Sequence, residues 1–383
     1  MRKITKFTTT RLVAGAATFA FLASGTATLA AFDVYALRKG DGVEVTGSHQ
    51  AHFIDLFSFN GGGATLQNSW AAPDSGADRI TQGGNFATYS QLALSVDGNF
   101  LSFMGRDVEV DGSGGSNDHV VGMFNLQTQT FDTSTRIPTE GAGIAQSGGR
   151  GFRAAISDGN DIWFTGRNPR IYHTTLGSDQ ATDIANTWEY NLIGIHNGDL
   201  HVSRRAGSTH GIHRWDGLPT ANVGAMDVRF ADEGTGWDND NGQYGSFAFV
   251  DNYLFVTNTA FGASDQISVF VNDGPDVWNL LDGPGQILTD SINGVPHLSA
   301  LKDGDEVRLF YSNEGGGDNN ALYSVTWDMS SQTFGTPEHL ANAGEGYTFA
   351  GVVAIPEPST YALIFGLGIL GAALLVRRRG RQA

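Results

Sequence analysis

The chain has 383 residues, including 52 glycines and no cysteine, and its 23 basic and 40 acidic residues give a formal net charge of −17. The lack of cysteine excludes disulfides, a thiolate nucleophile, iron–sulfur clusters and Cys-ligated zinc. The acidic balance excludes the basic surface that nucleic-acid binding needs. With 40% hydrophobic residues, among them 24 Phe, the chain can build a large core.

The charge is distributed unevenly along the chain. Residues 1–31 and the stretch after Pro358 together hold eight basic residues and no acid, so 23 − 8 = 15 basic and 40 acidic residues remain between them. The middle of the chain therefore has a net charge of −25, and its only lysines are Lys39 and Lys302. Such a body repels anions and attracts divalent cations.

The N-terminus has the three parts of a secretory signal peptide. Basic residues from Arg2 to Arg11 precede an apolar run, which ends in the small residues around Ala30 and Ala31. This order predicts export through the secretion translocon and cleavage after Ala30 or Ala31, which makes residues 1–31 the signal peptide. An uncleaved N-terminal membrane anchor is the alternative.

The C-terminus combines a Pro-Glu-Pro-Ser segment, an uncharged apolar run and a basic cluster. Residues 361–376 would form a single membrane helix of about 24 Å, which is short for a permanent span. The membrane stop, Arg377, Arg378 and Arg379, should stay in the cytoplasm, as should the basic N-terminus. Both ends thus place the acidic body beyond the inner membrane.

A glycine pattern inside this helix has no bearing on nucleotide binding. Residues 366–371 match G-x-G-x-x-G, but the dinucleotide fingerprint requires a preceding strand and a βαβ unit. Small residues in a membrane helix more often serve helix packing.

The C-terminal layout resembles the PEP-CTERM sorting signal of Gram-negative bacteria, over residues 355–383. The resemblance implies recognition and cutting by exosortase, a membrane protease–transpeptidase, followed by transfer to the cell surface or the extracellular matrix. The recognised box would be Pro356, Glu357 and Pro358, followed by Ser359, with a basic cluster at 377–381. These residues would be a substrate of another enzyme.

Residues 32–354 repeat a unit of two short apolar strands joined by an Asp-Gly or Asn-Gly type of turn. Such turns supply the positive φ angles of tight hairpins. The turns expected are Asp41-Gly42, Asp97-Gly98, Asp158-Gly159, Asn197-Gly198, Asp251-Asn252 and Asp303-Gly304. In the first unit, Val34–Leu37 would pair with Val43–Thr46. A third strand follows in five units, as in Val121–Leu126.

The repeat predicts an all-β protein of the β-propeller class. The turns recur about every 52 residues, close to the roughly 40–50 residues of a propeller blade, and radial closure leaves few open strand edges. Six blades fit best and seven also fit, with Phe349–Ala354 pairing with Phe32–Leu37 to close the ring. A β-sandwich or an elongated β-helix is the alternative. The body also resembles an uncharacterised group of exported bacterial propeller proteins, which implies a fold but no chemistry.

Three metal sites are candidates, although no catalytic motif is present. His196, Asp199 and His201 would share one face of the Asn197-Gly198 hairpin, a ligand set that suits zinc or another transition metal. Asp238 and Asp240 begin an imperfect calcium-loop pattern, and Asp107, Glu109, Asp111 and Asp118 surround another Gly-rich loop. Solvated turns would give the same patterns.

The remaining candidate is an aromatic residue for ligand stacking. Trp237, between Gly236 and Asp238, could stack on a sugar, whereas most other tryptophans fall in expected strands and should pack in the core. The sequence therefore predicts an exported surface or matrix propeller that binds exopolysaccharide, another surface protein or itself. The alternatives are a calcium-assisted hydrolase or lyase at the propeller channel, acting on polysaccharide or small esters, and a purely structural matrix component.

Overall fold

The computed structural model describes residues 32–43, 49–60, 63–83, 91–112, 118–138, 152–166, 170–186, 190–204, 211–224, 228–230, 244–258, 266–274, 277–289, 297–313 and 320–356. Every regular element within these ranges is a β-strand.

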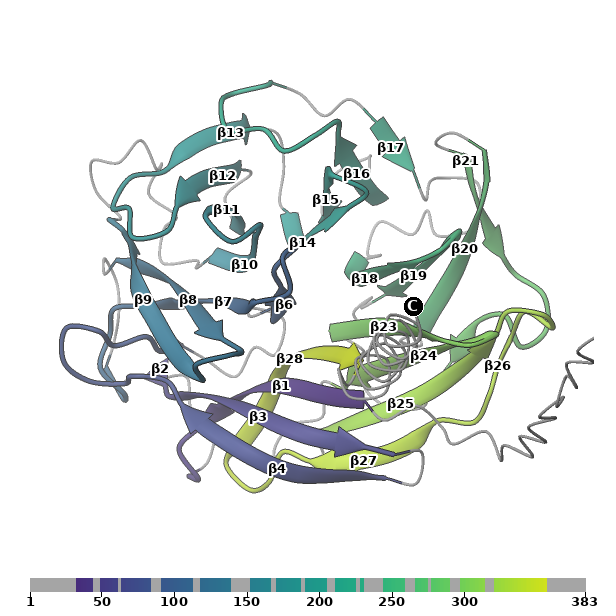
Figure 1. Cartoon of the computed structure of the whole chain (residues 1–383), viewed down its shortest axis with the longest axis horizontal. Coiled ribbons are helices and arrows are strands. Elements are labelled where there is room, and N and C mark those ends of the chain that lie inside the picture. Colours follow the sequence, from purple (N-terminus) through teal and green to yellow (C-terminus); the bar gives the residue numbers. More distant parts are fainter. Residues whose placement is uncertain are drawn as a thin grey trace, which may run out of the picture.

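Six antiparallel sheets are arranged as blades around a common axis (Figure 1). The all-β propeller is therefore confirmed, with the favoured number of six blades.

From the innermost strand outward, blade 1 consists of β28 (Tyr347–Pro356), β1 (Phe32–Gly40), β3 (His52–Phe59) and β4 (Ala64–Ala71), and blade 2 of β6 (Ala93–Leu94), β7 (Phe100–Arg106), β8 (His119–Asn125) and β9 (Thr130–Ile137). Blade 3 consists of β10 (Phe152–Ser157), β11 (Asp161–Gly166), β12 (Arg170–Thr175) and β13 (Thr182–Asn186), and blade 4 of β14 (Tyr190–His196), β15 (Asp199–Arg204), β16 (Gly211–Trp215) and β17 (Val228–Phe230). Blade 5 consists of β18 (Tyr244–Val250), β19 (Tyr253–Asn258), β20 (Gln266–Gly274) and β21 (Val277–Leu281), with β22 (Leu288–Thr289) also on β20. Blade 6 consists of β23 (His297–Asp303), β24 (Glu306–Ser312), β25 (Ala321–Asp328) and β26 (Thr333–Phe334), with β27 (Glu338–Asn342) also on β25. A two-stranded ribbon, β2 (His49–Gln50) with β5 (Gln82–Gly83), accompanies the blades.

The inner hairpins of blades 2 to 6 form where the turn residues predicted them. In blade 4, His196 pairs with Asp199 across the turn, and Asn197 and Gly198 have φ angles of 53° and 85°. Both angles lie in the left-handed region that a two-residue hairpin of this kind requires.

The prediction for the first unit was wrong. The strand that pairs with β1 is β3, in which Leu37 lies opposite Ile54. Val43 lies in a bend and is 64% exposed, and residues 44–48 fall outside the description. The Asp41-Gly42 pair resembled a hairpin turn, but the ribbon strand β2 lies between β1 and its true partner.

A hydroxyl near the end of the second strand has a structural role in two blades. The innermost strands β14 and β18 each contain a register shift, before Ile193 and Phe247. Next to these bulges, Ser203 Oγ accepts the Leu192 N–H at 3.0 Å and Thr257 Oγ1 accepts the Ser246 N–H at 2.7 Å. The hydroxyl thus accepts a hydrogen bond from a backbone N–H that the bulge leaves without a partner in the strand ladder.

The two ends of the described chain close the ring within one blade. Val34 pairs with Ala354 and Leu37 with Gly351, so the expected closure between β1 and β28 is confirmed. Arg38 reinforces it, because its guanidinium lies 4.7 Å from the Phe53 ring centroid and 4.2 Å from that of Tyr347. Its Nε also donates to Asp55 at 2.5 Å.

The hydrophobic core consists of the six interfaces between neighbouring blades. Each interface has its own cluster of buried side chains, for example Trp163 of blade 3 with Val202 of blade 4, and Phe255 of blade 5 with Trp327 of blade 6. A single blade would expose both faces, so stacking into a ring is what buries them.

The ring has two different ends, which the alternating strand directions define. We call one end the turn face. It holds the connections from first to second strand, such as Asp158–Asn160, Asn197–Gly198 and Gly304–Asp305, and those from third to fourth strand. The opposite end is the loop face, where second strands connect to third strands and one blade connects to the next.

Candidate functional site

The segment that resembled a sorting signal begins at the innermost strand of blade 1. β28 ends at Pro356, the first residue of the box, and Pro356 pairs with Phe32 at the start of β1. In blades 2 to 6 this position is the turn between first and second strand. Blade 1 instead has the two ends of the described chain there, Phe32 and Pro356, which lie side by side at the turn face.

The rest of both end signals lies outside the described residues. This applies to Ala30 and Ala31, to Glu357, Pro358 and Ser359, to the apolar segment 361–376, and to Arg377, Arg378 and Arg379. In the described part of the chain, no helix has the length and apolar character needed to cross a membrane.

The innermost strands are hydrogen-bonded to one another across the axis-facing side of the ring. Val96 N donates to Ser157 O at 2.9 Å, linking blades 2 and 3. Ala354 N donates to Ser299 Oγ at 3.0 Å, linking blades 1 and 6. Gln91 reaches two blades, because its N–H donates to Arg153 O and its Oε1 accepts the Ile193 N–H, both at 3.1 Å. These bonds hold the inner strands at backbone distance from their neighbours.

His196, Asp199 and His201 lie close together at the turn face of blade 4, as the hairpin register predicted. The His196 and His201 ring centroids are 6.1 Å apart. Both rings contact Phe249 of blade 5, which stacks on His196 at 4.2 Å and tilts against His201 at 4.8 Å. The ring centroids of Trp278 and Phe249 lie 5.6 Å apart in an edge-to-face arrangement, so the imidazoles belong to an aromatic cluster between two blades.

Other contacts occupy the groups of this trio. Asp199 Oδ1 accepts the Gly217 N–H at 2.7 Å, and Oδ2 lies 3.8 Å from Arg214 Nε. Burial lowers the pKa of His196 and lowers that of His201 to about 4, so both rings are neutral at pH 7. No group of three His, Asp or Glu side chains that could hold a metal ion occurs among the residues described.

Two of the four acidic residues near the second candidate calcium loop contact arginines. Asp107 Oδ1 lies 2.5 Å from Arg79 Nε, and its Oδ2 lies 3.0 Å from Arg136 Nη1. Glu109 lies 3.4 Å from Arg79. The first calcium candidates, Asp238 and Asp240, and the stacking candidate Trp237 fall outside the described residues.

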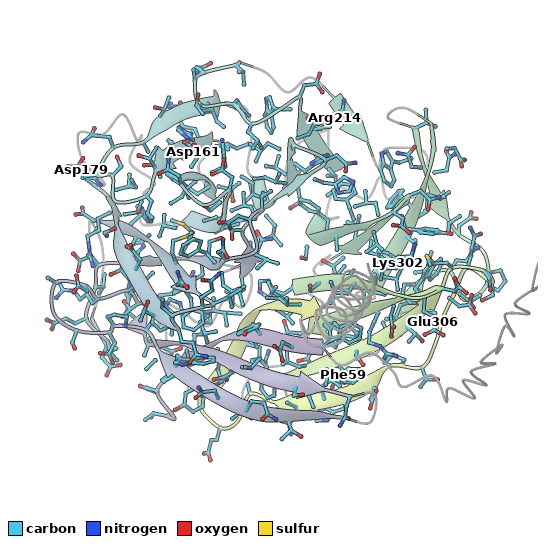
Figure 2. All side chains as sticks on the ribbon, in the orientation of Figure 1. Phe59, Asp161, Asp179, Arg214, Lys302 and Glu306 are labelled. Carbon is cyan, nitrogen blue, oxygen red and sulfur yellow. The ribbon has the colours of Figure 1, made fainter. Side chains whose placement is uncertain are left out.

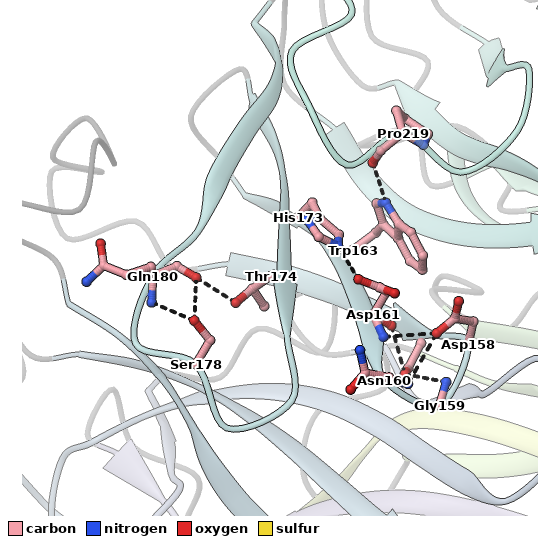
Figure 3. A network of polar contacts seen from close by, with 11 residues as sticks. Asp158, Gly159, Asn160, Asp161, Trp163, His173, Thr174, Ser178, Gln180 and Pro219 are labelled. Carbon is pink, nitrogen blue, oxygen red and sulfur yellow. Dashed lines mark hydrogen bonds and ion pairs between the residues drawn. The ribbon is translucent and has the colours of Figure 1, made fainter.

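Turn-face carboxylates in blade 3 fix the backbone and a neighbouring strand (Figure 3). Asp158 Oδ1 accepts the N–H groups of Asn160 and Asp161 at 3.2 and 2.9 Å. Asp161 Oδ1 lies 2.6 Å from His173 Nε2, and the neighbouring Trp163 donates to Pro219 O at 2.7 Å. Acids in such turns satisfy local donors, which is why Asp is common there.

Acidic residues recur around the whole turn face. Figure 2 shows Asp161, Asp179 and Glu306 distributed around the ring, together with Arg214 and Lys302. The described acids in these connections and at the adjoining strand ends are Asp97, Asp158, Asp161, Asp179, Asp199, Asp216, Asp251, Asp273, Asp303, Asp305, Glu306 and Asp328. Carboxylates therefore occur in the described turn-face connections of each of blades 2 to 6.

The loop-face ends of blades 1 to 3 bury a set of basic residues that no sequence motif groups together. We call them the loop-end basic residues: Lys39, His49, His52, Arg106, His119 and Arg153. Lys39 pairs with His52 and Arg106 with His119 in the strand registers. His52 is held between Ile80 O at 3.4 Å and Gln82 Oε1 at 3.3 Å.

Burial shifts the titration of this set strongly. It lowers the pKa of Lys39 to about 7, of His52 to about 4 and of His119 to about 3. The positive charges of Lys39 and Arg106 depress their histidine neighbours further. Each of these three groups thus disfavours an added proton, and the loop-face end of the core is sensitive to acid.

A comparison with protein families identifies one segment, at the C-terminal end of the sequence. Residues 354–379 match the PEP-CTERM protein-sorting motif. No characterised protein sequence matches the chain.

Solved structures similar to the chain include one from a nidogen/laminin complex, with a TM-score of 0.47 and 12% identity over 85% of this chain and 98% of that one. A putative 6-phosphogluconolactonase from Bacteroides uniformis gives a TM-score of 0.47 and 12% identity over 84% and 100% of the chains. A periplasmic gluconolactonase from Pseudomonas aeruginosa gives 0.45 and 13% over 80% and 83%.

Proposed function

We propose that the chain is the precursor of a cell-surface or matrix propeller. The sorting motif implies export, recognition by an exosortase and a surface or extracellular destination. In the proposed sequence of events, the translocon exports the chain and the signal peptide is removed after Ala30 or Ala31. Residues 361–376 then hold the body in the inner membrane, with Arg377, Arg378 and Arg379 on the cytoplasmic side.

One observation carries the proposal. The motif begins at residue 354, within the last three residues of β28. The box residues Glu357 and Pro358 therefore follow directly on the strand that closes the ring. A cut after Pro356 leaves β28 and its pairing with β1 complete, so the propeller survives processing as a closed ring.

A binding or structural role suits the released body better than catalysis. Several of the described acids serve turns or contact arginines, as Asp158 and Asp107 do. We propose exopolysaccharide or another surface protein as the partner of this acidic body. If the partner is anionic, Ca²⁺ is the cation most suited to bridge the two.

Replacing the acidic residue of the box tests the processing step. Glu357→Ala changes the motif but lies beyond β28, so the ring remains intact. We expect the variant to accumulate as a membrane-bound chain whose intact mass includes the terminal Arg381-Gln382-Ala383. The unchanged protein should be recovered from the surface or medium without the residues that follow the box.

Glu338→Ala is the matched control, since it removes an acid of β27 outside the motif. It should be processed like the unchanged chain. Normal maturation of Glu357→Ala, or a full-length C-terminus on the surface form of the unchanged protein, would contradict the proposal.

A further inference from the structure

We infer that the turn face lies against the lipid bilayer while the chain is anchored, so that the precursor displays its loop face away from the membrane. This inference rests on the proposed anchoring by residues 361–376. It concerns the orientation of the folded body, which neither the sorting motif nor the fold specifies.

The first step is the position at which the chain leaves the body. Pro356 is the last residue of β28 and pairs with Phe32, the first residue of β1. Both ends therefore emerge at the turn face, and β28 is the innermost strand of its blade, close to the ring axis (Figure 1). A tether near the middle of one face holds that whole face toward its anchor.

The second step is the length of the tether. Five residue steps separate Pro356 from Tyr361, where the apolar segment begins, and a fully extended chain of this length spans about 17 Å. β28 itself has 10 residues, which corresponds to a rise of about 30 Å along the strand. The tether is thus shorter than the body is thick, and it cannot pass round the ring to bring the loop face to the membrane.

The third step is the chemistry of the turn face. Its carboxylates, among them Asp97, Asp305 and Glu306, repel anionic lipid headgroups. Among the described residues of this face, the exposed large hydrophobic side chains are Val96, Val223 and Val277, at 59%, 50% and 49% exposure. The face has little affinity of its own for the bilayer, so the tether holds it there and cleavage of the tether should free it.

Fluorescent probes on the two faces test the orientation. Because the chain has no cysteine, a single introduced cysteine can carry an environment-sensitive dye. Asp305→Cys and Ser330→Cys label exposed sites in turn-face connections of blade 6, and Ser75→Cys labels an exposed loop-face site after β4. The full-length chain is reconstituted into vesicles of phosphatidylcholine and phosphatidylglycerol that contain a headgroup spin-labelled lipid.

We expect at least twofold stronger quenching at residues 305 and 330 than at residue 75. Ser330→Cys and Ser75→Cys are matched, since both replace an exposed serine. Equal quenching on the two faces, or stronger quenching at residue 75, would overturn the inference.

Co-flotation of the same samples with the vesicles separates the two levels of the argument. A full-length chain that does not float contradicts the proposed anchoring, and the inferred orientation with it. A chain that floats with equal quenching on both faces leaves the anchoring intact and overturns only the orientation.

Discussion

The turn face and the loop face of the same six blades differ in where they place charged side chains. At the turn face, carboxylates remain near solvent and cap short turns, as Asp97 and Asp158 do. At the loop face, Lys39, His52 and their basic neighbours are buried in the core. A body with a net charge of −25 between its two basic ends therefore buries three cationic side chains, Lys39, Arg106 and Arg153, at one end and displays carboxylates at the other.

The difference shows how one repeat can carry two kinds of constraint. A hairpin turn needs local acceptors and positive φ angles, and Asp, Asn and Gly supply them without tertiary contacts. A basic side chain in an interface between blades must give up hydration, so it lowers stability whenever it is protonated. The turn face should accordingly tolerate single changes, and the loop face should respond to pH.

The largest effect we predict is a change in acid sensitivity on removing a loop-end histidine. His52 has its pKa lowered to about 4 by burial, so the unfolded chain takes up the proton first as the pH falls. Stability is therefore lost from about pH 6.5 down to about pH 4. In His52→Gln, the decrease in unfolding free energy between pH 7 and pH 4.5 should shrink by about 2 to 3 kcal/mol, measured by urea titration of tryptophan fluorescence.

His339→Gln provides the control for this experiment. His339 is an exposed residue of β27 and bonds to Asn342 at 2.8 Å. Its replacement should leave the pH dependence close to that of the unchanged protein. If His52→Gln behaves in the same way as this control, the contrast between the two faces does not lie in their buried bases.

A smaller effect is expected from a carboxylate that caps a turn. Asp97 accepts bonds from Ser95 Oγ at 2.5 Å and from the Asn99 N–H at 3.1 Å. Burial acts to raise its pKa, but these hydrogen bonds outweigh burial and lower it. Asp97→Ala should cost about 1 kcal/mol at pH 7, and the cost should vanish as the pH falls through the Asp97 pKa.

Asp305→Ala is the comparison for this prediction, since it removes an exposed turn-face acid whose backbone carbonyl alone is bonded, to Met329 N. Thermal unfolding of both variants measures the difference. An equal loss of stability in the two variants would mean that the acids of this face contribute to stability through their charge and not through turn capping.

The parts of the fold that the sequence predicted are those determined by local chemistry. Asn197 and Gly198 specify a hairpin with few alternatives, and their register placed His196 opposite Asp199. The outer strands escaped prediction because little of their surface is buried, and β4 shows almost no apolar alternation. The first unit failed because Asp41-Gly42 matches a hairpin turn locally, whereas the partner of β1 is set by a tertiary contact.

The loop-end basic residues could not be predicted for a related reason. Lys39 stands between an arginine and a glycine at the end of a strand, a context that normally places lysine in solvent. Only the packing of blade 1 against blade 2, with the ribbon strands β2 and β5 beside them, buries it. In contrast, the sorting box is a linear motif, and its residues are recognisable without a fold.

The smallest effect we predict concerns the other lysine of the body. Lys302 Nζ lies 2.5 Å from Asp251 Oδ2, but the two side chains are 49% and 48% exposed. A pair this accessible to water contributes about 0.2 to 1 kcal/mol and is screened by salt. Lys302→Met should therefore change the urea midpoint only slightly, and the change should disappear at high salt.

The same substitution at Lys39 removes a buried amine and should stabilise the fold at pH 6, because a protonated lysine is favoured in the unfolded chain and disfavoured in the folded core. If the two substitutions change the unfolding free energy equally, the environments of the two lysines differ in geometry but not in their effect on stability.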